Sequence, residues 1–357
     1  MEKKQNAGRR KLIRRLFWFF LFMLLVVLTL RALTHGPHGL SPAQLLELLR
    51  SASPLWIAAA FLCMLGFILF EALSLRSLAI FLGNRRSLWR NTVYSAADIY
   101  FSAITPSATG GQPASAVFMM RDGMPGAVTT MCLLLNILLY TVSTLVVGVL
   151  CFVIYPSAFF AFPTFSRVLI LLGVAVQVLL LTGLLLLILR EGIILRISNA
   201  VLSLLHRLHL LKNVEARRES LHRMAEEYRT CIRAFRGGNF VVFRAFLLNL
   251  LQRFCNIAVT LCVYLAVGGS PALSREILVT QGFVVLGASA VPIPGAVGVS
   301  DFLFLAGFHE LIPDTVGVEL LSRGISFYVC LLLCGLIVLL VTILDAIRKR
   351  RKAAVKQ

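Results

Sequence analysis

Three ionisable residues lie inside apolar segments of this chain, where no solvent is expected. Glu71 and Arg76 belong to the run Leu55–Leu82, and Arg253 belongs to Phe240–Val267. A charged side chain within hydrocarbon is energetically unfavourable, so it normally faces a partner or a wet interior. Arg76 lies near the end of its run, where snorkelling to the interface explains it as well as a partner does. Glu71 and Arg253 lie deeper in their runs, so each needs a partner. For Arg253 the partner would be an acidic residue or a lipid phosphate.

A second group of polar residues follows helical spacing in the segment Leu88–Thr105. Its members recur every three or four positions: Asn91, Ser95, Asp98, Ser102 and Thr105. Such residues form one stripe along a helix. In a membrane protein the stripe must face the bundle interior or a wet cavity, because an unpaired polar group in hydrocarbon is strongly unfavourable. Asp98 is the sharpest functional candidate, and an interhelical hydrogen bond is the structural alternative.

Two breaks rich in glycine and proline interrupt the apolar pattern. Residues 102–113 read SAITPSATGGQP, and residues 289–298 read SAVPIPGAVG. Aligning the two segments with a one-residue gap superposes Pro106 on Pro294, Ala108 on Ala296, and Gly110 on Gly298. The second break therefore resembles a shortened copy of the first, and the pair suggests an internal repeat.

The composition sets the class of protein that these features belong to. Of 357 residues, 59% are hydrophobic and 14% are charged, which is far from soluble usage and indicates a polytopic helical membrane protein. The net charge of +19 comes from basic blocks between apolar runs. Such blocks set orientation and attract anionic lipid, so nucleic acid is not an expected partner. Most cysteines lie inside apolar runs, and we predict core packing for them rather than a disulfide framework.

The basic blocks also predict the topology. Residues 1–15 and the tail 348–357 are basic, so both termini are expected on the cytoplasmic side of the membrane. Full spans are predicted at Leu16–Leu33, Leu55–Leu82, Gly126–Tyr155, Arg167–Leu189, Phe240–Val267 and Arg323–Ile347. Residues 190–239 form a basic cytoplasmic segment, either an interfacial helix pair or a packed hairpin. Residues 313–322 are expected on the external side.

This topology requires two segments to enter and leave the membrane on one side. Residues 88–121 begin and end in the cytoplasm, whereas residues 276–312 begin and end outside. We therefore predict an all-α fold in a single integral membrane domain of residues 1–357. Its first half (1–189) and second half (240–347) each hold one re-entrant hairpin. Similar hairpins of opposite orientation are typical of inverted-repeat carriers, whose binding site lies near the midplane.

The short helices that begin near Gln112 and Ser300 would present free backbone N–H groups at the two breaks, and we expect Ser300 to be an N-cap. Free N–H groups at the start of a helix favour the binding of a phosphate or carboxylate. The alternative is that glycine and proline only permit tight helix packing. The candidate substrate-binding or translocation residues are Glu71, Arg76, Asp98, Ser102, Pro106, Gly110, Gly111, Gln112, Arg121, Arg253, Pro292, Pro294, Gly295, Gly298, Ser300, Asp301 and Arg323. No catalytic residue, metal site or cofactor is predicted; His206 and His209 have the spacing of metal ligands but lack further ligands.

Over residues 15–350, roughly, the chain resembles the lysylphosphatidylglycerol synthase transmembrane, or flippase-like, family. The resemblance rests on Pro106 with GGQP at 110–113, on Arg121-Asp122-Gly123, on PIPG at 292–295 with Gly298 and Asp301, and on Arg323. Ala296, Asp301 and Ser115 replace the glycine, glutamate and arginine that the family often has there, which puts the substrate in doubt. The soluble aminoacyl-transferase domain of the two-domain synthases is not expected, so the family name implies no synthase activity here.

The resemblance and the hairpins together predict a flippase-like protein that moves an anionic phospholipid or a polyprenyl-phosphate-type lipid through a midplane cavity. Two other functions stay open. One is a membrane enzyme that modifies a lipid head group, for which only Glu71, Asp98 and Asp301 are available as reactive groups. The other is a non-catalytic partner of a lipid or glycosyl transferase. A homodimer is also compatible with the sequence.

Overall fold

The computed structural model describes residues 42–105, 108–189, 238–291, 293–296 and 298–354. Its elements are α2 (Pro42–Ser51), α3 (Pro54–Phe81), α4 (Leu88–Ile104), α5 (Gly111–Arg121), α6 (Gly126–Ile154), α7 (Pro156–Ala161), α8 (Thr164–Leu189), α11 (Asn239–Ala266), η2 (Pro271–Leu273), α12 (Ser274–Ala288), η3 (Pro294–Ala296), α13 (Val299–Phe308), α14 (Thr315–Arg323), η4 (Gly324–Val329) and α15 (Cys330–Ala354). The predicted span Leu16–Leu33 and most of the basic segment 190–239 lie outside the described residues.

Five helical stretches in the described part are long and apolar enough to cross a membrane: Pro54–Phe81, Gly126–Ile154, Thr164–Ile188, Asn239–Ala266 and Thr315–Asp345. Large apolar side chains point outward along them, including Leu62, Leu179 and Leu344. Such extensive apolar exposure fits a surface that lipid covers. The all-α, polytopic membrane fold predicted from composition is thereby confirmed.

The helix that ends the described chain begins earlier than predicted. The last span was predicted to begin at Arg323, after the external residues 313–322, but α14 begins at Thr315 and continues through η4 into α15. The Asp314 carboxylate accepts a hydrogen bond from the backbone N–H of Gly317 at 3.0 Å, which caps the first turn. An aspartate at this position stabilises a helix start, so the helix begins in the polar sequence before Arg323.

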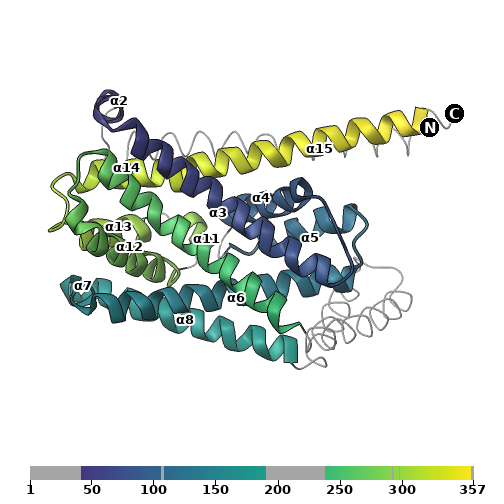
Figure 1. The fold of residues 1–357 in the computed structure, drawn as a ribbon, viewed down its shortest axis with the longest axis horizontal. Coiled ribbons are helices and arrows are strands. Elements are labelled where there is room, and N and C mark those ends of the chain that lie inside the picture. Colours follow the sequence, from purple (N-terminus) through teal and green to yellow (C-terminus); the bar gives the residue numbers. More distant parts are fainter. Residues whose placement is uncertain (1–41, 106–107, 190–237, 292, 297, 355–357) are drawn as a thin grey trace, which may run out of the picture.

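Two helical hairpins lie toward opposite ends of the bundle (Figure 1). Helices α4 and α5 form the first hairpin and α12 and α13 form the second. Between them run α3 and α11, which pack along each other, with α6 against α11 and α8 against α12. Helix α4 contacts α3 and α15, and the break of the second hairpin, η3, packs against α4. The second break therefore lies against the inner helix of the first hairpin.

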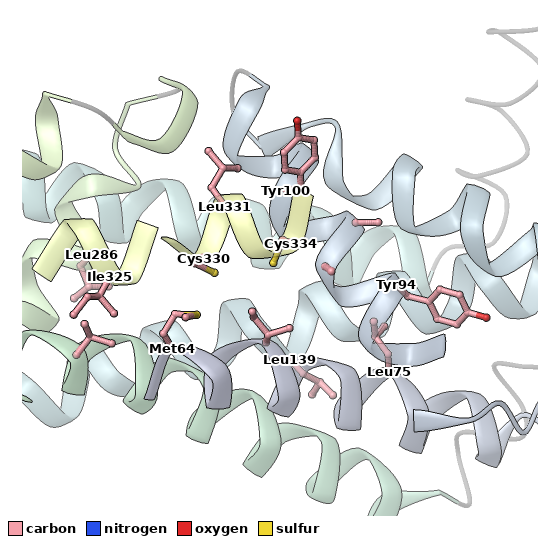
Figure 2. Close-up of a cluster of buried hydrophobic side chains, with 14 of the residues drawn as sticks. Met64, Leu75, Tyr94, Tyr100, Leu139, Leu286, Ile325, Cys330, Leu331 and Cys334 are labelled. Carbon is pink, nitrogen blue, oxygen red and sulfur yellow. The ribbon is translucent and has the colours of Figure 1, made fainter. Parts of the chain in front are cut away.

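Apolar packing holds this arrangement together. Figure 2 shows Met64 of α3 near the segment of α15 that carries Cys330 and Cys334, and it shows Leu75 further along α3. All four side chains are buried, and Leu75 and Cys334 are fully enclosed. The cysteines therefore act here as small core residues, as expected from their place in apolar runs.

Polar contacts fix the helices where apolar packing alone would allow sliding. Inside the bundle, Ser74 donates to Asn136 Oδ1 at 2.7 Å, and Asn249 Nδ2 donates to Ser74 Oγ at 2.9 Å, which joins α3, α6 and α11. At the open end of the first hairpin, Arg90 on α4 pairs with Asp345 on α15 at 3.1 Å and with Asp122, just after α5, at 3.5 Å. These contacts hold the first hairpin against α15.

Candidate functional site

The first polar centre joins α3 and α4 around two acidic residues. The carboxyl groups of Glu71 and Asp98 contact each other directly. Ser95 Oγ and Gln252 Nε2, from α4 and α11, each donate to Glu71 Oε2 at 3.1 Å. Glu71 and Asp98 are 5% and 7% exposed, so both carboxyl groups are held inside the protein. The sequence marked each acid as needing a partner, and the structure makes each the partner of the other.

Asp98 also connects α4 to the first turn of α5. Gln112 Nε2 donates to Asp98 Oδ2 at 2.6 Å, and Ser102 Oγ donates to Asp98 Oδ1 at 3.2 Å. A side chain at Gly111 would collide with Asp98 Oδ1 and Ser102 Oγ, so glycine is required for this close approach. Gly110 N donates to Thr105 Oγ1 at 2.8 Å and so ties the two ends of the break together.

Arg253 of α11 lies near this centre without a carboxylate in direct contact. Its guanidinium is stacked 4.0 Å from the ring centroid of Tyr140 and 5.4 Å from that of Phe67. The residue is 5% exposed, and its Nε has no hydrogen-bond partner among the described residues. Aromatic rings hold a planar guanidinium well while leaving its N–H groups available. Arg76, predicted to join the site, is half-buried, and its Nε is also without a described partner.

The second polar centre joins η3, α13 and α14. Arg323 forms an ion pair with Asp301 and donates to the backbone oxygen of Gly295 at 3.1 Å. Asp301 also accepts a hydrogen bond from the backbone N–H of Gly298 at 2.8 Å. Glu319 of α14 contacts Asp301 and is 8% exposed. Arg323 therefore interacts with both acids, and it also holds the backbone of the break through the carbonyl oxygen of Gly295.

The backbone of the two breaks shares a specific feature. Ala108 and Ala296 have φ of 54° and 50°, and they are the non-glycine residues with positive φ in the described chain. The sequence alignment superposes these two alanines. An L-residue in this conformation costs about 1–2 kcal/mol, so both breaks hold an unfavourable backbone at corresponding positions.

Each break also places an acid of the chain beside the short helix that follows. Asp98 lies beside Gly111, where α5 begins, and Asp301 lies in the first turn of α13. The sequence predicted that the free N–H groups of these helices would meet an external anion. The carboxylates of Asp98 and Asp301 already lie beside the starts of these helices, where a negative charge is favourable. An anionic ligand would therefore depend more on arginine than on the helix ends.

The remaining predicted residues fall outside the two centres or outside the description. Arg121 is exposed at the end of α5, 5.5 Å from the ring centroid of Phe118. Ser300 is not the N-cap of its helix: α13 begins at Val299 with Gly298 at that position, because the Asp301 carboxylate binds the Gly298 N–H. Pro294 begins η3. Pro106 and Pro292 are not among the described residues.

Three residues in or beside these centres were not singled out from the sequence. Asn136 lies in the long apolar helix α6, Tyr140 lies one turn further, and Glu319 lies in the stretch that was expected outside the membrane. A lone asparagine in an apolar span is a usable signal of an interior contact. Tyr140 gave no such signal, because aromatic residues are common in membrane helices.

The described residues contain no group of three His, Cys, Asp or Glu side chains placed to hold a metal ion. Carboxylates, amides, hydroxyls and arginines make up both centres instead. This donor set can bind protons, cations or oxyanions.

Comparison with known proteins identifies the family. No curated protein and no solved structure matches the chain. The family described as the lysylphosphatidylglycerol synthase TM region matches residues 12–334, which include the described parts of both hairpins and both polar centres. The chain therefore belongs to the lysylphosphatidylglycerol synthase TM region family.

Proposed function

We propose that this membrane protein translocates an anionic phospholipid or a lipid-linked phosphate across the bacterial inner membrane. The observation that carries the proposal is the contact between the two hairpins, because η3 packs against α4, the helix that carries the buried Asp98. Helical backbone that is interrupted at membrane depth must be buried in protein or line a polar path. The family assignment supports a role in lipid handling.

In this proposal the two hairpins enter from opposite faces and form an inverted repeat. Their places toward opposite ends of the bundle (Figure 1) and the shared positive φ of Ala108 and Ala296 support this relation. The basic residues of the sequence then put both termini, and the open end of the first hairpin, in the cytoplasm. The two halves rock against each other as the head group passes.

Arg253 is the group best suited to receive the phosphate. It is buried, stacked on Tyr140 and Phe67, and forms no ion pair with a described residue. Arginine binds phosphate oxygens in a bidentate manner and with good geometry. Arg323 is less available because Asp301 and Gly295 already occupy its guanidinium.

A lipid-movement assay tests the proposal. The full chain is reconstituted into liposomes that carry a fluorescent anionic phospholipid in both leaflets, and dithionite bleaches the outer leaflet. We expect bleaching beyond the outer half, and we expect Arg253→Lys to lower the rate while Arg244→Lys leaves it unchanged. Arg244 is the matched control, because it lies on the same helix and is exposed. No movement of any anionic lipid or polyprenyl phosphate would contradict the proposal.

Two other results would indicate the alternatives. A new lipid product detected by mass spectrometry would indicate a membrane enzyme. A stoichiometric complex with a lipid or glycosyl transferase, together with no lipid movement, would indicate a non-catalytic partner. Sizing of the purified protein reports in the same experiment whether it forms a homodimer.

A further inference from the structure

Glu71 and Asp98 form an acidic pair in a place where few positive groups can reach. Their carboxyl groups touch, and both side chains are more than nine-tenths buried. The charged or titratable groups that face Glu71 from the packed helices are Asp98 of α4, Arg253 of α11 and Cys334 of α15. Arg253 acts on Glu71 only through space and forms no ion pair with it. Two carboxylates in contact repel each other strongly unless something positive lies between them.

Apart from Glu71, the groups that contact Asp98 are uncharged. Ser102 and Gln112 donate hydrogen bonds to it, and η3, which packs on the same helix, contains only proline, glycine and alanine. Arg121 stands at the other end of α5 and is exposed. The described protein therefore supplies no positive charge in direct contact with either acid.

A second observation is independent of the acids themselves. Gln252 is 1% exposed, its Nε2 donates to Glu71, and its Oε1 has no hydrogen-bond partner among the described residues. Gln112 repeats this arrangement: Nε2 donates to Asp98 and Oε1 is buried without a described partner. Buried acceptors without donors are unfavourable and are normally satisfied. The two glutamines that hold the acids therefore each keep a buried acceptor without a described donor, and neither brings a positive charge to the pair.

We propose that the Glu71–Asp98 pair is a proton-binding site, which takes up and releases one shared proton during the transport cycle. A proton needs only the two touching carboxyl oxygens. A sodium ion needs several oxygens arranged around it, yet both glutamine amides here turn their nitrogen, not their oxygen, to the carboxylates. The geometry therefore favours a proton over a metal cation.

The position of the pair suggests how the proton would affect the protein. Asp98 connects α4 to the start of α5 through Gln112, and Glu71 connects α3 to α11 through Gln252. Loss of the proton leaves two facing carboxylates, which favours separation of the first hairpin from α3. Uptake of the proton restores the contact. This coupling of protonation to lipid movement rests on the proposed function, whereas the binding of the proton does not.

The test measures proton binding without transport. Thermal midpoints of the full chain in detergent are compared between about pH 6 and pH 9 for wild type, Glu71→Gln, Asp98→Asn and the exposed control Glu47→Gln. A folded state that holds an extra proton loses stability as the pH rises. We expect the midpoint of wild type and Glu47→Gln to fall by several degrees over this range, and the slope to flatten in Glu71→Gln and Asp98→Asn. Equal slopes in all four proteins would overturn the proposal.

A chemical probe identifies the site and the cation. Dicyclohexylcarbodiimide reacts with protonated carboxyl groups in apolar surroundings, and peptide mapping locates the adduct. We expect labelling at Glu71 or Asp98 that decreases up to about tenfold per pH unit once the pair titrates. Sodium chloride and choline chloride should give equal labelling at one pH. Protection by sodium alone would overturn the proton in favour of a sodium site.

The results separate the two proposals. If the pair titrates but no lipid moves, the proton site stands and the proposed function fails. Suppose instead that lipid moves, that the pH dependence of the thermal midpoint is the same in all four proteins, and that a pH gradient does not change the rate of lipid movement. The proposed function then stands and the proton site fails.

Discussion

The two hairpin breaks differ in the cation beside their acids. Asp98 of the first break faces a second carboxyl group, Glu71, and receives hydrogen bonds from neutral side chains. Asp301 of the second break also faces a second acid, Glu319, but it forms an ion pair with Arg323, which binds the backbone of the break at Gly295 as well. The first centre therefore lacks a directly bound cation, whereas in the second an arginine pairs with Asp301 and ties down the break. Two similar backbone breaks can thus differ in mobility: the first is free to change its conformation, whereas the second is held in place by Arg323.

The largest effect should come from removing the cation of the second break. Arg323→Ala leaves Asp301 and the buried Glu319 without their shared arginine and frees the Gly295 carbonyl. Breaking a buried ion pair costs about 3–5 kcal/mol, and we expect the lower value because the Asp301 side chain is 31% exposed. Thermal unfolding in detergent measures this loss.

The control for that prediction is Arg275→Ala. Arg275 pairs with Glu276 at 3.1 Å, but its side chain is 61% exposed. Surface pairs contribute about 0–1 kcal/mol. If Arg323→Ala were no more destabilising than Arg275→Ala, the second break would not be fixed by its ion pair, and the contrast between the breaks would fail.

The next effect tests the close approach at the first break. Gly111→Ala puts a methyl group against Asp98 and Ser102, so the hairpin must open slightly. Overpacking of this kind costs typically about 1–3 kcal/mol, and lipid movement should fall with it. Gly183→Ala on α8 is the control, because nothing lies within 4 Å of its added carbon. Equal behaviour of the two variants would show that α4 and α5 are not packed as described.

Asp98→Asn tests function with little change of shape. Asparagine has nearly the shape of aspartate and keeps one acceptor oxygen, which can replace the oxygen that accepts from Ser102 or the one that accepts from Gln112, so we expect the protein to remain folded in the membrane. Transport should fall at least about tenfold, equivalent to roughly 1.4 kcal/mol. Membrane yield and the liposome assay are measured together. Loss of expression in place of activity would assign Asp98 a structural role.

The smallest effect should be shared by both breaks. Ala108→Gly and Ala296→Gly each remove an L-residue from positive φ. Glycine relieves about 1–2 kcal/mol of that strain but adds about 0.5–1 kcal/mol of chain entropy, so the net gain stays below about 1.5 kcal/mol. Ala114→Gly, within helix α5, should instead destabilise the protein. Opposite responses of Ala108 and Ala296 in unfolding experiments would argue against equivalent breaks.

Much of the fold follows from sequence because the bilayer limits the choices. The long apolar runs and the ends of α4 and α5 could be placed from hydrophobic length and from breakers such as Gly110 and Gly123. Asp314 shows where this reasoning stops: the same residues can end a turn or cap a helix, and only the hydrogen bond to Gly317 decides between them.

The sequence could predict which residues belong to the site but not which of them contact one another. Glu71, Asp98 and Arg253 stand out because ionisable groups are rare in apolar spans. Their spacing along single helices cannot show that Glu71 meets Asp98 while Arg253 stacks on Tyr140, because those contacts depend on how three helices pack. Asn136 was missed for the same reason, since its partners Ser74 and Asn249 lie far away in sequence.

The proposed transport requires each hairpin to begin and end on one side of the membrane. Cysteine accessibility tests this topology most directly. In a background with the native cysteines replaced by alanine, single cysteines at Ser87, Gly123, Ala272 and Pro313 flank the two hairpins. An impermeant maleimide applied to intact spheroplasts should label Ala272→Cys and Pro313→Cys, and should label Ser87→Cys and Gly123→Cys only after permeabilisation. Labelling of Ser87→Cys and Gly123→Cys from opposite sides would show that α4 and α5 cross the membrane, which contradicts the account.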